Sequence, residues 1–304
     1  KNPEYGAVFT YNLNDVPKTS KSLRMQRERR LNVDKKDIPF PGYDKLTDEM
    51  NEKSASIILT IKDSEGNHIR NVKKNASNGS SRIAWNLRHQ SYYPIRAGRG
   101  QVNSWFNPSG PYVTPGEYHA EIYLENNGSV EKLDGPIAFN VKPLRKGTLQ
   151  GASYSDYNSF RTRVSSLYIS MSKYQDEFNM MKSKIQLLDK ASMQLETFSP
   201  EIMKKISDFR AKYNAFDSET RSSPARDEIG EWYKPTISSR IRIAMQGLST
   251  SYGPTDLNKS NLDIAERLFE KLAADVKEFK SELESLENEV KELNPPHLSG
   301  SGIN

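Results

Sequence analysis

The sequence contains no cysteine among its 304 residues. This absence excludes disulfide bonds, thiolate nucleophiles and cysteine-bound zinc, so the fold must be stabilised by packing. The sequence also has no apolar run near the roughly 18 residues that a membrane helix needs, which predicts a chain that does not span a membrane. Neither an initiator Met nor the apolar segment of a signal peptide stands at its start, and we expect a mature or excised fragment.

Catalytic and cofactor motifs are absent as well. The four histidines form no HExxH motif and no i,i+4 pair with another metal ligand; they are His68, His89, His119 and His297. The sequence also lacks GxSxG, GxxxxGK[ST] and GxGxxG motifs. It therefore offers no nucleophilic-serine elbow, no phosphate-binding loop and no dinucleotide-binding loop. The sequence therefore predicts no catalytic residue, no metal site and no cofactor.

Two groups of carboxylates lack the features of a calcium site or of a catalytic acid–base pair. Residues 63–67 offer oxygen ligands for calcium but lack the terminal bidentate Glu, so we expect a plain β-turn. Glu282, Glu284 and Glu287 lie on a charged helical stretch, where we expect all three to face water and not to act as an acid–base pair.

The composition favours an elongated folded protein. Hydrophobic residues make up 35% of the chain, yet 15 Tyr, 11 Phe and 3 Trp supply apolar mass that a disordered chain would lack. A chain of this length accommodates two ordinary domains.

The positive charge is local. The formal net charge is +5, but residues 18–36 alone carry eight Lys or Arg against Glu28 and Asp34. This segment lacks aromatic residues between its cations for base stacking, so we expect a solvated helix packed on its own domain and no nucleic-acid binding.

The first part of the chain alternates apolar and polar residues with period two, which indicates antiparallel strands. The expected inward series are Phe9-Tyr11-Leu13, Ile57-Leu59-Ile61, Ile83-Trp85-Leu87, Tyr118-Ala120-Ile122-Leu124 and Ile137-Phe139-Val141. Turn residues separate these runs, so residues 1–145 are predicted to form an Ig-like or fibronectin-like β-sandwich. A charged helical insertion is expected at 18–52, with a second short helix after the break at 39–42.

Beyond residue 146 the apolar period becomes helical. Two series follow a 4-3 spacing: Phe160, Val164, Leu167, Met171, Tyr174, Phe178, Met181, Ile185 and Leu188, and later Ala265, Phe269, Leu272, Val276, Phe279, Leu283, Leu286, Val290 and Leu293. Such spacing is typical of a coiled-coil seam. With two shorter helices between them, residues 146–296 are predicted to form an all-α antiparallel coiled-coil hairpin or four-helix bundle, and 297–304 a flexible tail. The fold class expected is α+β with two domains.

A long segment at about 89–115 is rich in large amphipathic side chains. It carries Tyr92, Tyr93, Arg96, Arg99, Trp105, Phe106 and Tyr112. Tyr, Trp and Arg dominate interface hot spots, and loops of this length are usually functional or disordered. Two interpretations remain open: these side chains pack on their own sheet, or they form an interface with a protein partner.

Several motifs occur in an order that resembles a known family. They are Asn2-Pro3-Glu4-Tyr5-Gly6, Ile38-Pro39-Phe40-Pro41, Ile61-Lys62-Asp63, Gly66-Asn67-His68, Arg82-Ile83-Ala84-Trp85-Asn86 and Pro115-Gly116-Glu117-Tyr118. Together they resemble the region after the propeller in bacterial sortilin-like, BNR-repeat β-propeller proteins, common in Bacteroidota and often labelled glycosyl hydrolase. The resemblance covers residues 2–143, and the helical part only in general character. Asn86 departs from the Asp that the family usually has there.

The resemblance implies a non-catalytic accessory and protein-interaction module of an exported protein. Its expected partner is a β-propeller domain of the same parent or a cell-envelope complex, and its expected location is extracytoplasmic. Sialidase-type chemistry in this family would lie in the propeller, whose Asp-box repeats are absent here. The alternative is a fragment that completes a glycoside hydrolase active site housed mainly in a propeller.

Overall fold

A computed structural model describes residues 5–95, 110–144, 149–221, 224–231 and 234–296. Its contacts divide the chain into two units. The described part of the β unit is 5–91 with 110–144, and that of the helical unit is 92–95 with the described residues from 149 onward. The tail predicted at 297–304 lies outside the described residues.

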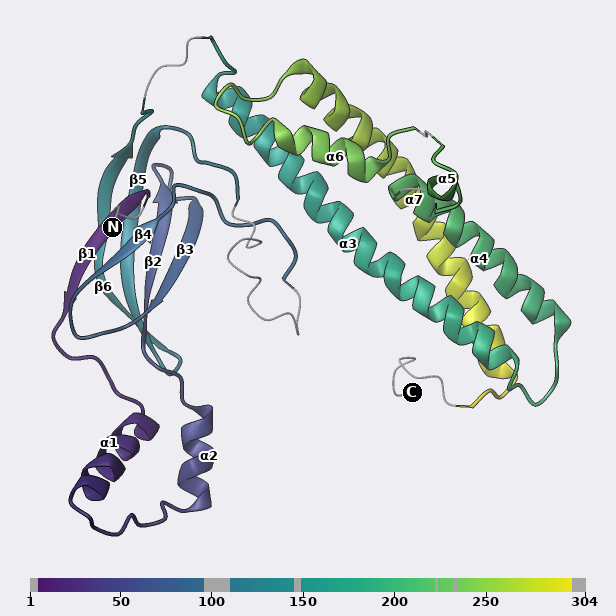
Figure 1. Ribbon diagram of the computed structural model, residues 1–304. Coiled ribbons are helices and arrows are strands. Elements are labelled where there is room, and N and C mark those ends of the chain that lie inside the picture. Colours follow the sequence, from purple (N-terminus) through teal and green to yellow (C-terminus); the bar gives the residue numbers. More distant parts are fainter. Residues whose placement is uncertain (1–4, 96–109, 145–148, 222–223, 232–233, 297–304) are drawn as a thin grey trace. The chain divides into compact units, whose positions relative to one another are not determined.

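The β unit contains two antiparallel sheets (Figure 1). Its strands are β1 (Ala7–Leu13), β2 (Ser56–Asp63), β3 (His68–Asn75), β4 (Gly79–Trp85), β5 (Gly116–Asn126) and β6 (Ser129–Val141). β1 pairs with β4, and the other sheet has the order β3-β2-β5-β6. The class is therefore mixed, with antiparallel sheets followed by a helical region.

Both sheets contribute to one hydrophobic core, as the period-two pattern predicts. Ile57, Leu59 and Ile61 of β2 are buried together with Ile83 and Trp85 of β4. Their alternation with less buried residues places them on the inner face of each strand.

One predicted core position is wrong. Ile137 of β6 is 47% exposed, although Phe139 and Val141 pack against the core as expected. β6 is an edge strand, and its pairing with β5 shifts register between Ala120 and Ile122. Register shifts of this kind bend a strand and turn side chains away from the core.

The turn between β2 and β3 is the predicted β-turn. The backbone N–H of Gly66 donates to the carbonyl oxygen of Asp63 at 3.0 Å. Oδ1 of Asp63 accepts from the backbone N–H groups of Glu65 and Asn67 at 3.0 and 2.8 Å. The carboxylate is thus occupied in stabilising its own turn.

Two helices interrupt the β unit between β1 and β2. They are α1 (Ser20–Val33) and α2 (Tyr43–Asn51). Thr19 caps α1, accepting from the backbone N–H of Ser22 at 3.2 Å. Neither helix contributes a residue to the hydrophobic core of the β unit.

The helical unit is built on two long helices. Its elements are α3 (Tyr154–Ser192), α4 (Pro200–Thr220), α5 (Pro224–Glu228), α6 (Ile237–Gln246) and α7 (Asp256–Glu292). All nine positions of the first 4-3 series are buried on α3, as are seven of the nine in the second series. These side chains form one core with the apolar faces of α4 and α6. Among the described helices, none is long and apolar enough to cross a membrane.

The predicted antiparallel arrangement of the two long helices is wrong, because α3 and α7 run parallel. Arg163 pairs with Glu266 near their beginnings, Glu177 pairs with Lys280 further along, and Lys184 pairs with Glu287 near their ends. Partners that advance together along both helices define a parallel register.

The helices between them explain this direction. Along α4, Lys205 pairs with Glu289 and Lys212 pairs with Glu282, so α4 runs antiparallel to α7. α6 does the same, because Arg240 bonds to Asn261 while Asn258 bonds to the carbonyl oxygen of Ile243. The chain does not reverse between α4 and α6, and these two helices together make a single return pass along α3 and α7 (Figure 1).

Candidate interaction surfaces

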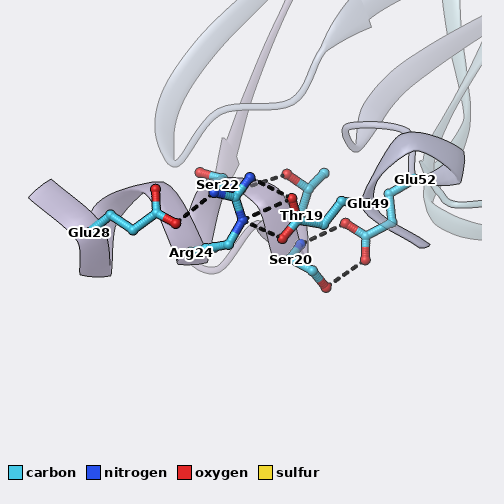
Figure 2. Close-up of polar contacts among 7 residues, drawn as sticks. All are labelled: Thr19, Ser20, Ser22, Arg24, Glu28, Glu49 and Glu52. Atoms are coloured by element: carbon cyan, nitrogen blue, oxygen red, sulfur yellow. Dashed lines mark hydrogen bonds and ion pairs between the residues drawn. The ribbon is translucent and has the colours of Figure 1, made fainter. Parts of the chain in front are cut away.

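A charged network joins α1 to α2 (Figure 2). The guanidinium of Arg24 on α1 donates from Nε and Nη2 to the carboxylate of Glu49 on α2, both at 2.7 Å. Its Nη1 donates to Glu28 at 2.7 Å. At the start of α1, the backbone N–H and the hydroxyl of Ser20 both donate to Glu52 at 2.6 Å. Residues far apart in sequence thus hold the two helices side by side.

The network fixes the charge states of its members. The hydrogen bond from Arg24 lowers the pKa of Glu49 below its usual range. Burial acts in the opposite direction, but its effect is smaller. The same bonds raise the pKa of Arg24 above its ordinary value. Glu49 is buried, and its bidentate ion pair with the guanidinium of Arg24 sets the orientation of α2 on α1.

A cleft of about 570 Å³ lies between the two helices. Its lining combines apolar and charged groups: Ser20, Leu23, Arg24, Arg27, Glu28, Leu31, Pro39, Phe40, Pro41, Lys45, Asp48 and Glu49. Leu23 and Leu31 come from one face of α1, and Phe40 lies in the connection between the helices. Its lining thus offers a bound group both apolar surface and charge.

The α1–α2 pair also exposes large apolar side chains. Phe40 is 64% exposed, and its ring contacts that of Tyr43 with the centroids 5.0 Å apart. Tyr43 is 80% exposed and Met50 is 85% exposed. The sequence pattern predicted only a solvated charged helix here, although the i,i+7 spacing of Tyr43 and Met50 within α2 was available as a signal.

Most cations of the basic segment are left uncompensated. Arg24 is neutralised by Glu49 and Glu28, and Lys36 lies 3.9 Å from Asp34. In the described part of the chain, the other cations of 18–36 form no ion pair within 4.0 Å. The segment does pack on its own unit, as expected, but through α2 rather than through a sheet.

The structure places the aromatic residues predicted as an interface in two locations. Tyr92 and Tyr93 stack on each other, and their ring centroids lie 5.2 and 4.9 Å from that of Tyr168 on α3. Burial, with smaller contributions from neighbouring tyrosines, raises the pKa of Tyr92 to about 12. Both residues belong to the helical unit.

Tyr112 instead belongs to the β unit. The guanidinium of Arg88 lies 3.6 Å from the centroid of its ring. Nearby, Asn86 accepts from Arg70 at 3.1 Å, and burial with the neighbouring Arg88 lowers the pKa of Arg70. Arg96, Arg99, Trp105 and Phe106 lie outside the described residues. The assignment of these seven side chains to an interface stays a prediction.

The sheet formed by β3-β2-β5-β6 carries a second charged cluster. Glu121 of β5 accepts from Lys132 of β6 and pairs with Lys62 of β2, each at 2.7 Å. These bonds lower the pKa of Glu121 to about 2. The one carboxylate lies between two lysines from the neighbouring strands, so the cluster ties three strands together.

Glu287 corrects the expectation that the late carboxylates all face water. It is 8% exposed and pairs with Lys184 of α3 and with Lys291. Burial acts to raise its pKa, but the hydrogen bonds from the two lysines outweigh burial and lower it. Glu287 directly follows the buried Leu286, so it lies at the margin of the apolar seam and within reach of Lys184 on α3.

The described residues contain no group of three or more His, Cys, Asp or Glu side chains placed to hold a metal ion. No family model, curated protein or solved structure matches the chain. The α1–α2 pair, with its cleft, exposed apolar side chains and unpaired cations, is therefore the candidate site on which a function can be argued.

Proposed function

We propose that this chain is a non-catalytic accessory and protein-interaction module of an exported, propeller-containing bacterial protein. In this proposal the α1–α2 pair is its docking element. The observation that carries it is the display of Phe40, Tyr43 and Met50 beside a cleft, on helices that add nothing to the core of their own unit. Exposed apolar patches rimmed by charge mark protein-binding sites.

The rigidity of the pair supports this role. Arg24 and Glu49 fix the two helices to each other, so a partner meets a preorganised surface rather than a loose segment. Preorganisation lowers the entropy cost of binding. Aromatic and methionine side chains are also enriched at interface centres, and the α1–α2 pair has both kinds exposed.

The same proposal includes the finer form of the two units. We propose an Ig-like or fibronectin-like sandwich for the β unit, supported by the core that its two sheets share. For α3 and α7 we propose coiled-coil packing in the parallel sense, supported by their 4-3 spacing of buried residues.

Binding to a propeller domain encoded in the same gene tests the proposal. A titration would use the two parts produced separately, with Phe40→Ser and Met50→Ser on the docking element. Met180→Ser on α3 is the matched control, because Met180 is 64% exposed on the other unit. We expect the first two variants to weaken binding roughly tenfold or more and the control to leave it unchanged. Equal binding by all three variants, or a parent gene without a propeller, would contradict the proposal.

The rival function, completion of a glycoside hydrolase site, predicts a different result. Turnover of a panel of glycosides by the parent protein would fall sharply on removal of these 304 residues if they supplied part of the active site. An accessory module changes kcat little.

A further inference from the structure

Two half-buried arginines of the β unit are neighbours although they carry the same charge. Arg70 lies on β3, and Arg88 lies in the segment that follows β4. Burial and the charge of Arg88 both lower the pKa of Arg70. In the part of the chain that the structure describes, neither guanidinium forms an ion pair with a carboxylate. The repulsion between the two side chains is therefore not offset by an acidic group.

Neutral groups hold both guanidiniums in place. Nη1 of Arg70 donates to Oδ1 of Asn86 at 3.1 Å. Nη1 of Arg88 donates to the carbonyl oxygen of Gly110 at 3.2 Å, and the ring centroid of Tyr112 lies 3.6 Å from the same guanidinium. A guanidinium has five N–H groups, so each arginine keeps donors for an acceptor from outside the chain.

The backbone around Arg88 is fixed on two sides. The N–H of Gln90 donates to the carbonyl oxygen of Ile69 on β3 at 2.9 Å, and the N–H of Val113 donates to the carbonyl oxygen of Leu87 at 3.0 Å. Leu87 has a φ of 58°, in the left-handed region that is unfavourable for a residue with a side chain. Strained backbone of this kind concentrates at binding and catalytic sites. Arg88 is thus presented on a preorganised segment.

We propose that Arg70 and Arg88 bind a side-chain carboxylate from an acidic segment of a protein partner. A planar carboxylate accepts parallel hydrogen bonds from a guanidinium, and its charge offsets the repulsion between the two arginines. Beside them, Tyr112 is 40% exposed and Tyr5 is 67% exposed, with their ring centroids 6.5 Å apart. These rings offer a contact surface to the apolar part of the same segment. The site shares no residue with the α1–α2 pair and does not depend on its proposed role.

The charge of the chain favours a single acidic group over a polyanion. The net charge is +5 and residues 18–36 contribute +6, so the remainder of the chain has a net charge of −1. Lys73, on the same strand as Arg70, is paired with Glu125 at 3.0 Å. A nucleic acid binds a row of cations along its phosphates, whereas two neighbouring guanidiniums are enough for one carboxylate.

A capped tetrapeptide with two central glutamates tests the site in the full chain. Its binding is followed by NMR at the Nε–Hε signals of Arg70 and Arg88. The same peptide with two glutamines is the uncharged comparison, and inorganic phosphate is a second anion. Asn86→Asp places a carboxylate where Arg70 already donates a hydrogen bond and keeps the size of the side chain. We expect it to weaken binding of the glutamate peptide roughly tenfold or more, without lowering the melting temperature.

Asn71→Asp is the matched control. It makes the same change in net charge on the same strand, where successive side chains point to opposite faces. It should bind the glutamate peptide like the unmodified chain, whereas Arg70→Gln should bind it at least tenfold more weakly.

Four results would overturn the proposal: equal binding of the two peptides, binding of phosphate without binding of the glutamate peptide, undiminished binding by Asn86→Asp, or an equal loss in both Asp variants. None of the altered residues lies on α1 or α2, so the propeller titration tests the docking element separately.

Discussion

The ring of Phe178 on α3 stacks on the ring of Tyr213 on α4, with the centroids 4.1 Å apart and the planes 14° apart. Both residues are buried, and the ring of Tyr174, one turn earlier on α3, also stacks on Phe178, with the centroids 5.5 Å apart. This pair therefore joins the return pass of the helical unit to its first long helix. Aromatic stacking adds to the free energy of burial.

We expect Phe178→Ala to lower the free energy of unfolding of the helical unit by about 3–5 kcal/mol, because it leaves a cavity beside the rings of Tyr174 and Tyr213. Phe178→Asp or Phe279→Asp should prevent the helices from packing, since each also buries an unpaired charge. Urea unfolding followed by circular dichroism at the helix band measures the loss. Met180→Ala is the control on an exposed position of the same helix. An equal loss in both alanine variants would show that Phe178 is not a core position.

The parallel direction of α3 and α7 can be tested by cross-linking, because the chain has no cysteine of its own. Glu177→Cys with Lys280→Cys places two thiols at positions that form an ion pair, and a short bifunctional maleimide should join them. Arg163→Cys with Glu287→Cys should not react, because their positions lie about 30 Å apart along the helices. In an antiparallel hairpin the second pair would lie close together and react, which mass spectrometry of the digested product detects.

Acid should weaken the β unit partly through Glu121. Its pKa in the folded state is about 2, below the ordinary value of 4.5, so the ionised carboxylate stabilises the fold fully at higher pH. This contribution is lost as the pH falls from about 4.5 toward 2. Glu121→Gln should therefore be less stable than the unmodified chain at neutral pH, and the difference should shrink in acid. Urea unfolding at several pH values measures it, with Glu131→Gln at an exposed position of β6 as the control; a difference that does not depend on pH would contradict the assignment.

Tyr168→Ala should destabilise the helical unit by about 1–3 kcal/mol, because it removes the ring contacts with both Tyr92 and Tyr93. Tyr154→Ala on the same helix is the control, since Tyr154 is exposed. Thermal unfolding of the three proteins compares them. Equal melting temperatures would show that the two tyrosines do not contribute to the stability of this unit.

The interface predicted for residues 89–115 has its own test. Trp105→Ala with Arg99→Ala should weaken binding of the propeller partner by at least about 2 kcal/mol and leave the melting temperature of the isolated chain nearly unchanged. A fall of many degrees in the melting temperature would instead assign these side chains to the folded core.

Local periodicity predicted the interior of both units well. Leu59 and Trp85 were placed correctly because a strand that is buried on one face must alternate, and Phe178 because a packed helix repeats its apolar residues every three or four positions. Ile137 was misplaced because the register shift between β5 and β6 depends on strand pairing, which period-two alternation does not report.

The direction of the helices could not be predicted in the same way. A 4-3 spacing is identical for parallel and antiparallel neighbouring helices. The direction of α7 also depends on whether the chain reverses between α4 and α6, which the spacing does not report. Glu287 was expected to face water because it lies on a charged helical stretch, although Lys184 reaches it from α3. The exposure of Tyr43 and Met50 on the docking element could not be predicted either, because it depends on what α2 packs against.

The single return pass through α4 and α6 has a mechanical consequence. Because α3 begins where α7 begins, and α7 ends where α3 ends, the chain enters the helical unit at one end and leaves it at the other, about 55 Å away. A pulling force on the chain would act along the helix axes and load their packed faces in shear, so that many side chains must slide past each other together. A hairpin with both ends on one side would open one contact at a time. The parallel direction of α3 and α7 therefore favours resistance to tension along the helix axes.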